Sequence, residues 1–175
     1  MIGLAAMSSF STCDLCDAHE DRLRDGRIQI FAPGYFSFGR RKRFHGPAST
    51  LAVFEDNALV RESVMQPGHG RVLVVDGRGS LGVALLGGNL ANFAAANGWA
   101  GVIVHGAVRD VDELNEAEIG IRALGLRPRR AGKTGEGARD ARVQFSSVTI
   151  EPGAYVYADA DGILVSTEAL ELRAD

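Results

Sequence analysis

The sequence predicts a single α/β domain built around a mixed sheet. Residues 72–75 and 101–104 are continuous apolar runs rich in valine, as expected for strands that are buried on both faces. A helical pattern lies between them, so the two runs are predicted to be parallel strands joined by a helix. After Ile119 the chain changes to short β segments separated by Gly, Asp and Pro, which is typical of antiparallel strands. Parallel strands followed by antiparallel strands favour a compact mixed-sheet domain.

The first third of the chain contains two predicted helices and two predicted strands. Thr12 or Asp14 is a suitable N-cap for the first helix, and Asp56 opens the second. A glycine-containing loop over 32–43 separates the two strands. In chain order, the elements predicted here are a helix over 12–24, strands over 28–31 and 47–54, and a helix over 56–64.

The rest of the chain contains a long helical pattern, a short helix and the late strands. An apolar stripe that starts at Leu81 predicts a helix between the two buried strands, and Asn97-Gly98 is its stop signal. Acidic residues in the first turn favour a further helix over 110–118. A long loop over 127–140, which is basic and rich in glycine, interrupts the β segments after Ile119. These segments are 123–126, 141–145, 148–150, 154–157 and 162–165.

Composition narrows the classes of function. The 175 residues, 46% of them hydrophobic, suffice for one core, and a formal net charge of −3 gives no overall basic field for nucleic acid. The basic runs 40–43 and 127–130 are expected to be solvated loops, so no direct nucleic-acid partner is expected. No apolar run approaches the roughly 20 residues of a membrane span. We therefore expect a cytoplasmic protein without membrane contact, with a flexible extension over 1–11 and one domain over 12–175.

Residues 77–82 spell the glycine pattern G-x-G-x-x-G directly after a predicted strand. In dinucleotide-binding proteins this pattern lets a pyrophosphate approach a helix N-terminus. Such a site also needs an acidic residue at the end of the next strand, where this chain has His105-Gly106. A tight turn is therefore the favoured interpretation. His105 is expected mainly as a packed histidine, although it lies nearest to the candidate site.

The segment Gly87-Gly88-Asn89-Leu90 predicts a helix start that can bind an anion. Two glycines inside a helix cost about 1 kcal/mol each relative to alanine, so the chain is expected to break there and restart at Asn89, a good N-cap. The new N-terminus would direct N–H groups at a carboxylate. Close packing of helix on sheet through glycine is the alternative explanation.

Arg109 and Asp110 follow the second buried strand and lie at the expected ligand-binding edge of an α/β sheet. Arginine matches a carboxylate or 2-oxo acid with its planar fork, and Asp110 is either a metal ligand or a plain N-cap. With so few carboxylates a metal ion would keep several waters, which suits Mg²⁺ or Mn²⁺. Glu113 lies one turn later on the same face. It is a candidate second metal ligand, a group that contacts a metal ligand without binding the metal itself, or a base.

At these residues the chain resembles the RraA-like family of ribonuclease regulators and metal-dependent class II aldolases. The resemblance extends from Cys13-Asp14-Leu15-Cys16-Asp17 to Asp161-Gly162-Ile163 and includes residues 54–57, 70–77 and 106–109. The family's aldolase motif is a glycine, twenty residues, Arg-Asp and an acidic residue three positions on. Gly88, Arg109, Asp110 and Glu113 match it. Glu118 stands where the family often has an aspartate.

The resemblance implies a swivelling α/β/β/α-type domain that assembles into a ring-shaped homotrimer. It also implies that the amides of 87–90 and the Arg109 side chain bind the pyruvoyl part of a 2-oxo acid, and that Asp110 ligates a divalent metal. The implied activity is a pyruvate-releasing lyase, a 4-hydroxy-4-methyl-2-oxoglutarate aldolase with oxaloacetate decarboxylation as a side reaction. Longer aldolases of the family carry extra C-terminal sequence that this chain lacks. The alternative is a non-catalytic regulator that binds ribonuclease E or its helicase partners.

Overall fold

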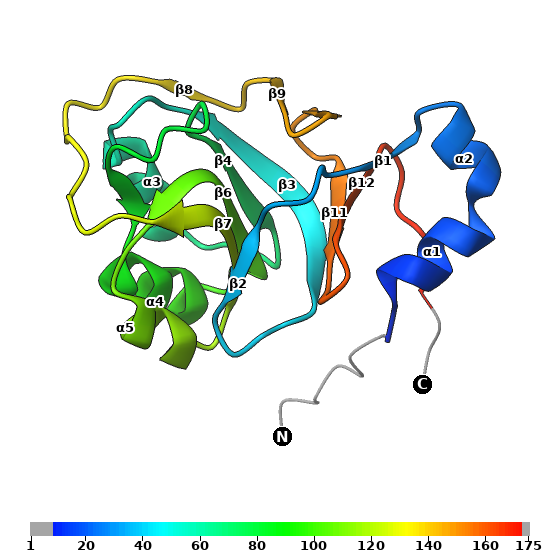
Figure 1. Ribbon diagram of the computed structural model, residues 1–175, viewed down its shortest axis with the longest axis horizontal. Coiled ribbons are helices and arrows are strands. Elements are labelled where there is room, and N and C mark those ends of the chain that lie inside the picture. The colour runs from blue at the N-terminus through cyan, green and yellow to red at the C-terminus, as the bar shows by residue number, and fades with distance from the viewer. Residues whose placement is uncertain (1–8, 173–175) are drawn as a thin grey trace.

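A ten-stranded mixed sheet organises the chain in the computed structural model, which describes residues 9–172 (Figure 1). The main path of the sheet is β1-β12-β11-β3-β4-β6-β7-β2, with β5 paired to β6 and β8 paired to β3. A separate hairpin consists of β9 and β10. The strands are β1 (Ile28–Ile30), β2 (Phe36–Phe38), β3 (Phe44–Ala52), β4 (Val72–Asp76), β5 (Ala84–Leu86), β6 (Gly101–Val108), β7 (Gly120–Leu126), β8 (Ala138–Arg139), β9 (Val143–Phe145), β10 (Val148–Ile150), β11 (Tyr155–Ala158) and β12 (Ile163–Ser166).

Four neighbouring strands, β3, β4, β6 and β7, run parallel, and the strands outside them at both ends of the main path pair antiparallel. The mixed α/β sheet predicted from the sequence is therefore confirmed. The helices are α1 (Thr12–Ala18), α2 (Glu20–Arg24), α3 (Ala58–Val64), α4 (Gly88–Ala96) and α5 (Val111–Glu116). Within residues 9–172, none of these short helices has the length and apolarity that a membrane-crossing helix needs.

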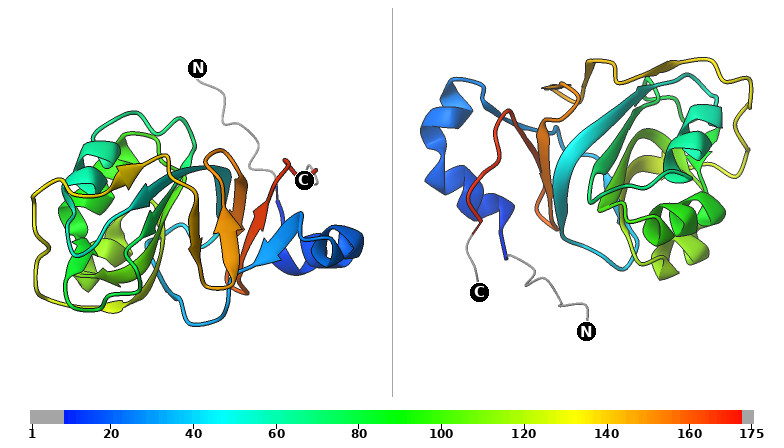
Figure 2. Two further views of the ribbon diagram at one scale, coloured as in Figure 1. Left: turned by 90° about the horizontal axis from the view of Figure 1, so that it is seen from above. Right: turned by 180° about the vertical axis from the view of Figure 1, so that it is seen from behind.

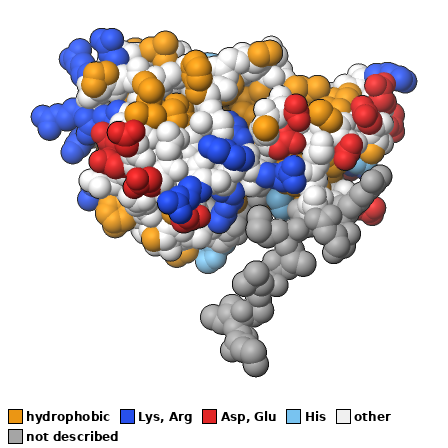
Figure 3. Space-filling model, turned by 60° about the horizontal axis from the view of Figure 1, so that its bottom comes forward, with side chains coloured by type: hydrophobic (Ala, Val, Ile, Leu, Met, Phe, Trp, Pro, Cys, Tyr) orange, Lys and Arg blue, Asp and Glu red, His pale blue; other side chains and the backbone are white. Residues whose placement is uncertain are grey.

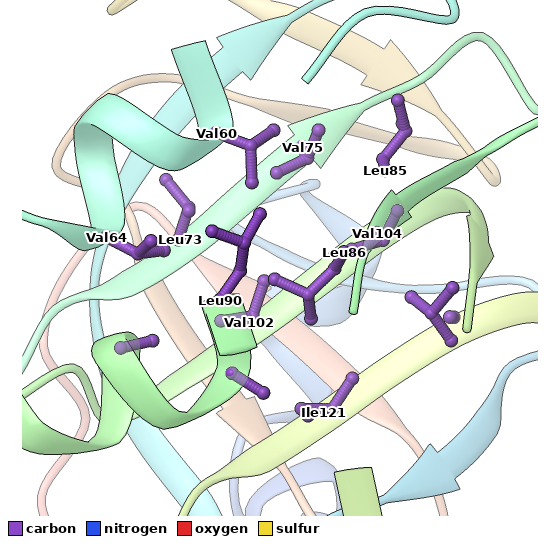
Figure 4. Packing of buried hydrophobic residues seen from close by; sticks show 14 of the residues in the cluster. Val60, Val64, Leu73, Val75, Leu85, Leu86, Leu90, Val102, Val104 and Ile121 are labelled. Atoms are coloured by element: carbon purple, nitrogen blue, oxygen red, sulfur yellow. The ribbon is translucent and has the colours of Figure 1, made fainter. Parts of the chain in front are cut away.

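The parallel strands bury side chains on both faces, which explains their uninterrupted apolar sequence. In β4, Leu73 and Val75 belong to the core under α3 and α4, whereas Val72 and Val74 belong to a second core against β9 to β12. Figure 4 shows the first core, in which Val60 and Val64 from α3 and Leu90 from α4 lie over the strands. Alternate residues of one strand therefore hold two layers together.

A third core lies beneath α1 and α2, on the other side of the molecule from α3, α4 and α5 (Figures 1 and 2). It contains Phe10, Leu15 and Tyr157, and Phe10 is 7% exposed. The ten-stranded sheet thus folds over on itself, and the three cores lie between four layers: the helices α3 to α5, two parts of the sheet, and the helices α1 and α2. Of the extension expected over 1–11, residues 1–8 lie outside the described residues. The ring-shaped trimer stays a prediction.

The first predicted helix is two helices. The chain breaks at His19, whose φ and ψ of −130° and 37° are not helical, so α1 and α2 replace one helix over 12–24. Its predicted caps were wrong, because Ser11 is the N-cap and accepts from the N–H of Asp14 at 3.4 Å. The backbone N–H and hydroxyl of Thr12 instead donate to the buried carboxylate of Asp159, both at 2.7 Å.

The helix predicted from Leu81 onward is correct only in its second half. Residues 84–86 form β5, and α4 begins at Gly88 with Gly87 as N-cap, so Asn89 is not the cap. Leu85 and Leu86 lie in a strand beside β6 and are buried in the core beneath the helices. A buried strand and the buried face of a helix are equally apolar, so the sequence pattern did not distinguish them. β6 also continues past residue 104 to Val108, because its far end pairs with both β5 and β7.

Phe44 at the start of β3 packs on two glycines that are register partners, Gly101 in β6 and Gly120 in β7. A Cβ on Gly101 would contact the ring, 2.8 Å from its Cγ atom, and one on Gly120 would lie 2.6 Å from the Arg41 carbonyl oxygen. The ring is 3% exposed and Arg122 lies over it at 5.2 Å. Glycine is therefore required at both positions by the space that Phe44 occupies.

We predict that Gly101→Ala lowers the free energy of unfolding by about 1–3 kcal/mol, because the added methyl group overpacks the contact with Phe44. Chemical denaturation monitored by circular dichroism measures the change. Gly162→Ala is the control, because nothing lies within 4 Å of a Cβ at that position. Equal stability of Gly101→Ala and the wild type would contradict the packing role of Phe44.

Candidate functional site

The candidate site lies at the carboxyl ends of the parallel strands, where the chain leaves β5 and β6. Leu86 of β5 pairs with Val108 of β6, and the Arg109 N–H donates to the Leu86 carbonyl at 3.0 Å. This pairing sets Arg109-Asp110 beside Gly87-Gly88, although about twenty residues separate them in the chain. Ligands in α/β sheets bind at this edge of the sheet.

Asp110 connects the two segments through its side chain. Its carboxylate Oδ2 accepts a hydrogen bond from the Gly88 N–H at 3.0 Å, so it caps the start of α4. Asp110 occupies the N-cap position of α5 but makes no side-chain cap there, and its φ of 63° is left-handed. Non-glycine residues hold this conformation at a cost, typically where the surrounding structure imposes it at functional sites. Asp110 is thus the N-cap residue of α5 by position, as one interpretation of the sequence expected, but its side chain bonds the start of α4 instead.

The two glycines allow α4 to approach the Arg109–Glu113 segment closely. A Cβ on Gly87 would lie 2.6 Å from Asp110 Oδ2, and one on Gly88 would contact the Glu113 carboxylate and lie 2.6 Å from Glu113 Cβ. Any larger residue would displace these acidic side chains. The anion-binding and close-packing explanations of the glycine pair are thus compatible, because the close packing is against the acidic residues of the site.

The guanidinium of Arg109 is held from two sides. Its Nε lies 3.9 Å from Asp110 Oδ2, and its Nη1 donates to the Pro128 carbonyl at 3.3 Å. The Arg109 and Asp110 side chains are each 39% exposed, so their ion pair contributes little to stability in water. These contacts instead fix the direction in which the positively charged guanidinium of Arg109 points at the edge of the pocket.

A pocket of about 190 Å³ opens here, lined by residues that follow several strands of the sheet. Positive charge predominates in it, because Arg61, Arg109, Arg130 and Lys133 face a single carboxylate, Asp110. Figure 3 shows basic side chains both at the left end, where Figure 1 places the loop after β7, and across the lower centre, with acidic side chains beside them. In a chain of net charge −3, the surplus of positive charge in this pocket favours an anionic ligand.

The structure brings together most of the residues that the sequence singled out. Gly87, Asn89, Leu90, Arg109 and Asp110 line the pocket. Gly88 lies just behind them and donates to Asp110, whereas Glu113 packs on Gly88 and does not line the pocket. Sequence reasoning missed the other pocket residues, for which the only signal was the basic run after β7. They are Asn57, Arg61, Ala84, Arg130, Ala131 and Lys133.

The donor set suits a weakly held, hydrated cation. Within the described part of the chain, no three His, Cys, Asp or Glu side chains are grouped closely enough to hold a metal ion. Asp110 alone offers a half-exposed carboxylate in the pocket. Mg²⁺ is commonly bound through one or two carboxylates with waters and substrate oxygens as the remaining ligands. Asp110 therefore fits such an ion and does not fit a closed zinc site.

His105 lies outside this pocket, as is expected of a packed histidine. Its ring stacks on Phe145 at 4.5 Å, and its Nδ1 lies 2.8 Å from the Tyr35 hydroxyl. That hydroxyl also bonds Ser146 Oγ at 2.7 Å, and burial raises the pKa of Tyr35 to about 12. Burial also lowers the pKa of His105, although Asp76 acts in the opposite direction.

Comparison with known proteins identifies relatives along nearly the whole chain. The RraA-like family, described as Aldolase/RraA, matches residues 12–165. A protein of Burkholderia mallei (strain SAVP1) named "Putative 4-hydroxy-4-methyl-2-oxoglutarate aldolase" is 55% identical over 161 residues, covering 92% of this chain and 98% of that protein.

Two solved structures are similar in both sequence and fold. The structure of the RNA-processing inhibitor RraA from Thermus thermophilus has a TM-score of 0.87 at 45% identity, covering 93% of this chain and 96% of the other. A Geobacillus kaustophilus structure described as an S-adenosylmethionine:2-dimethylmenaquinone methyltransferase has a TM-score of 0.85 at 47% identity, covering 92% and 97%.

We predict that His105 titrates below its usual value of 6.5, and that the fold loses stability as pH falls from about 6.5. Because the unfolded chain then binds more protons than the folded one, acid favours unfolding. His45, whose pKa burial also lowers, acts in the same direction. NMR of the ring protons gives the two pKa values, and denaturation at pH 7.5 and 5.5 gives the stabilities. A smaller acid-induced loss is expected for His105→Asn, and an unchanged loss would contradict the prediction.

Proposed function

Because the chain belongs to the RraA-like family, we propose that it is a divalent-metal-dependent lyase that releases pyruvate. The proposed main substrate is 4-hydroxy-4-methyl-2-oxoglutarate, with decarboxylation of oxaloacetate as a side reaction. The observation that carries this proposal is the meeting of Arg109, Asp110 and the start of α4 in one positively charged pocket. The 55% identity to the Burkholderia protein, over 98% of its length, supports the same activity.

The carboxylate of the 2-oxo acid would bind at the N-terminus of α4. The first hydrogen bond within this nine-residue helix is from the Ala91 N–H to the Gly87 carbonyl, at 3.0 Å. The N–H groups of Asn89 and Leu90 therefore have no partner within the helix. They face a substrate carboxylate from the positive end of the helix dipole. The Gly88 N–H is used to orient Asp110.

Arg109 and Asp110 would act on the keto end of the substrate. Asp110 would hold the divalent cation, which when bound supplies Lewis-acid polarisation of the keto oxygen. Arg109 donates to the oxygen on which negative charge develops as the carbon–carbon bond breaks. The Pro128 carbonyl that binds Nη1 keeps the guanidinium turned toward this position.

Aldol cleavage has an additional requirement, a base for the C4 hydroxyl group. When the base removes this proton, the C3–C4 bond breaks and its electrons pass to the keto oxygen as an enolate. Protonation at C3 then yields one pyruvate, and the C4 fragment is the second. Glu113, which packs on Gly88 beside the pocket, is the proposed source of this base, acting through a water. Oxaloacetate decarboxylation forms the same enolate without deprotonating a hydroxyl.

We predict that Asp110→Asn lowers the rate of metal-dependent pyruvate release from either substrate by about 10²-fold or more, as expected for loss of a group at the reacting centre. A lactate dehydrogenase-coupled assay with Mg²⁺ or Mn²⁺, repeated with EDTA, measures this. Asp112→Asn is the matched control, because Asp112 is exposed in the same first turn and does not line the pocket. Full activity of Asp110→Asn would contradict the assigned role.

Glu113→Gln separates the base from the rest of the machinery. Aldol cleavage should fall about 10²–10⁴-fold, the range for loss of a general base, while decarboxylation falls much less. The two rates are measured on the same preparation so that any loss of folded protein affects both equally. Equal losses for both substrates would remove Glu113 as the base.

A regulatory role is the second candidate, favoured by the 45% identity to the Thermus RNA-processing inhibitor RraA. It predicts that the protein binds ribonuclease E or an associated RNA helicase and inhibits RNA cleavage. Such binding through an outer surface would be indifferent to Asp110→Asn and to EDTA. Pull-down and RNA-cleavage assays with the wild type and this variant distinguish it from the lyase, and both activities are compatible with one chain.

A further inference from the structure

The loop after β7 is fixed to the body of the protein by a buried carboxylate. Asp56 is 4% exposed, and its Oδ2 accepts from the backbone N–H of Thr134 and from the Thr134 hydroxyl, the latter at 2.9 Å. Its Oδ1 accepts from the N–H of Gly135 at 3.2 Å and from that of Ala58 at 3.0 Å. One side chain at the entrance to α3 thus fixes two residues that lie 78 and 79 positions later.

Backbone contacts fix the same loop at two further points. Gly132 forms a parallel bridge with Asp56, donating to the Glu55 carbonyl at 2.8 Å and accepting from the Asn57 N–H at 3.0 Å. Arg130 forms a second bridge with Ala84 at the start of β5, where the Arg129 carbonyl accepts at 2.8 Å. These contacts fix residues 129–135, called the basic loop below, to the entrance of α3 and to the start of β5.

The basic loop carries its charges to the candidate site. Ala131 is 6% exposed and belongs to the main core, while its neighbours Arg130 and Lys133 are exposed and line the pocket with Arg109. Among the ion pairs of residues 9–172, neither Arg130 nor Lys133 takes part in one. The pocket thus has four cations and one carboxylate, Asp110, and this surplus of fixed positive charge is unfavourable until an anion binds.

We infer that the basic loop recognises a second carboxylate of the substrate, through Arg130 and Lys133, and that Asp56 is the residue that positions it. This inference rests on the proposed function, in which α4 and Arg109 already hold the 2-oxo carboxylate. The surplus of positive charge then selects dicarboxylic 2-oxo acids over monocarboxylic ones. The specificity is preformed, because the loop needs no movement to bring its cations to the pocket.

The test compares two substrates that differ only at this carboxylate. They are 4-hydroxy-4-methyl-2-oxoglutarate and 4-hydroxy-4-methyl-2-oxopentanoate, in which a methyl group replaces the second carboxylate. The quantity compared is the ratio of kcat/KM for the dicarboxylate to kcat/KM for the monocarboxylate. Lys133→Met and Arg130→Met should each lower this ratio by about tenfold, mainly through a higher KM for the dicarboxylate. An unchanged ratio in both variants would overturn the inference.

The chain offers matched controls for both substitutions. Lys42 is the other lysine of the sequence and is exposed outside the pocket, and Arg127 lies on the same connection without lining the pocket. Lys42→Met and Arg127→Met remove the same charges and should leave the ratio unchanged. A fall in the ratio for these controls as large as for the pocket variants would mean that net charge alone is responsible, which also overturns the inference.

Asp56→Asn tests the positioning role. The amide keeps the size of the side chain but replaces one acceptor oxygen with a donor, so the basic loop loses part of its anchor. The expected result is a lower ratio with KM for the dicarboxylate raised and kcat for the monocarboxylate little affected. A variant that is less stable but keeps the wild-type ratio would make Asp56 a purely structural residue.

A readout that needs no turnover separates this inference from the proposed function. With two lysines in the chain, amine acylation followed by mass spectrometry reports on Lys133 with Lys42 as internal reference. 2-Oxoglutarate should protect Lys133 more than 2-oxobutyrate does. Absence of pyruvate release by the wild type would refute the lyase, and protection would still support the basic loop. Equal acylation with both ligands would refute the loop's role even in an active enzyme.

Discussion

The hydrogen bond from the Gly88 N–H to the Asp110 carboxylate joins the two halves of the site. It depends on the pairing of β5 with the far end of β6, which is required to bring a helix start beside the turn that carries Arg109. It also depends on two glycines, because a side chain at either position would occupy the space of an acidic group. Asp110, which accepts this hydrogen bond, has a left-handed backbone. The residues proposed for anion recognition and for metal binding are therefore adjacent in the structure.

Local sequence predicted the elements of this arrangement better than their junctions. The buried strands at 72–75 and 101–104 and the helix stop at Asn97 were correct, since uninterrupted valine runs and glycine stops depend on nearby residues. β5 was not predicted, because its buried leucines have the same apolarity in a strand as in a helix. The contribution of the basic loop was not predictable either. It depends on contacts between Asp56 and residues 132–135. These segments are far apart in the chain, so their contact produces no periodic pattern in the sequence.

The fold alone does not determine the activity. Relatives of similar identity are named for an aldolase, an RNA-processing inhibitor and a methyltransferase, so the choice depends on the chemistry of the site. In this chain the pocket combines one exposed carboxylate with cations from three different segments. That composition is suited to a small, multiply charged acid. The surface that a protein partner would contact need not include it.

The short helix α3 places the core and the pocket one residue apart. Val60 is completely buried under the sheet, and the next residue, Arg61, lines the pocket. A substitution that shifts α3 to repack the core therefore also moves a charge toward or away from the ligand. A substitution at Val60 or Val64 that repacks the core is therefore expected to change the position of the Arg61 charge in the pocket as well as the stability of the fold.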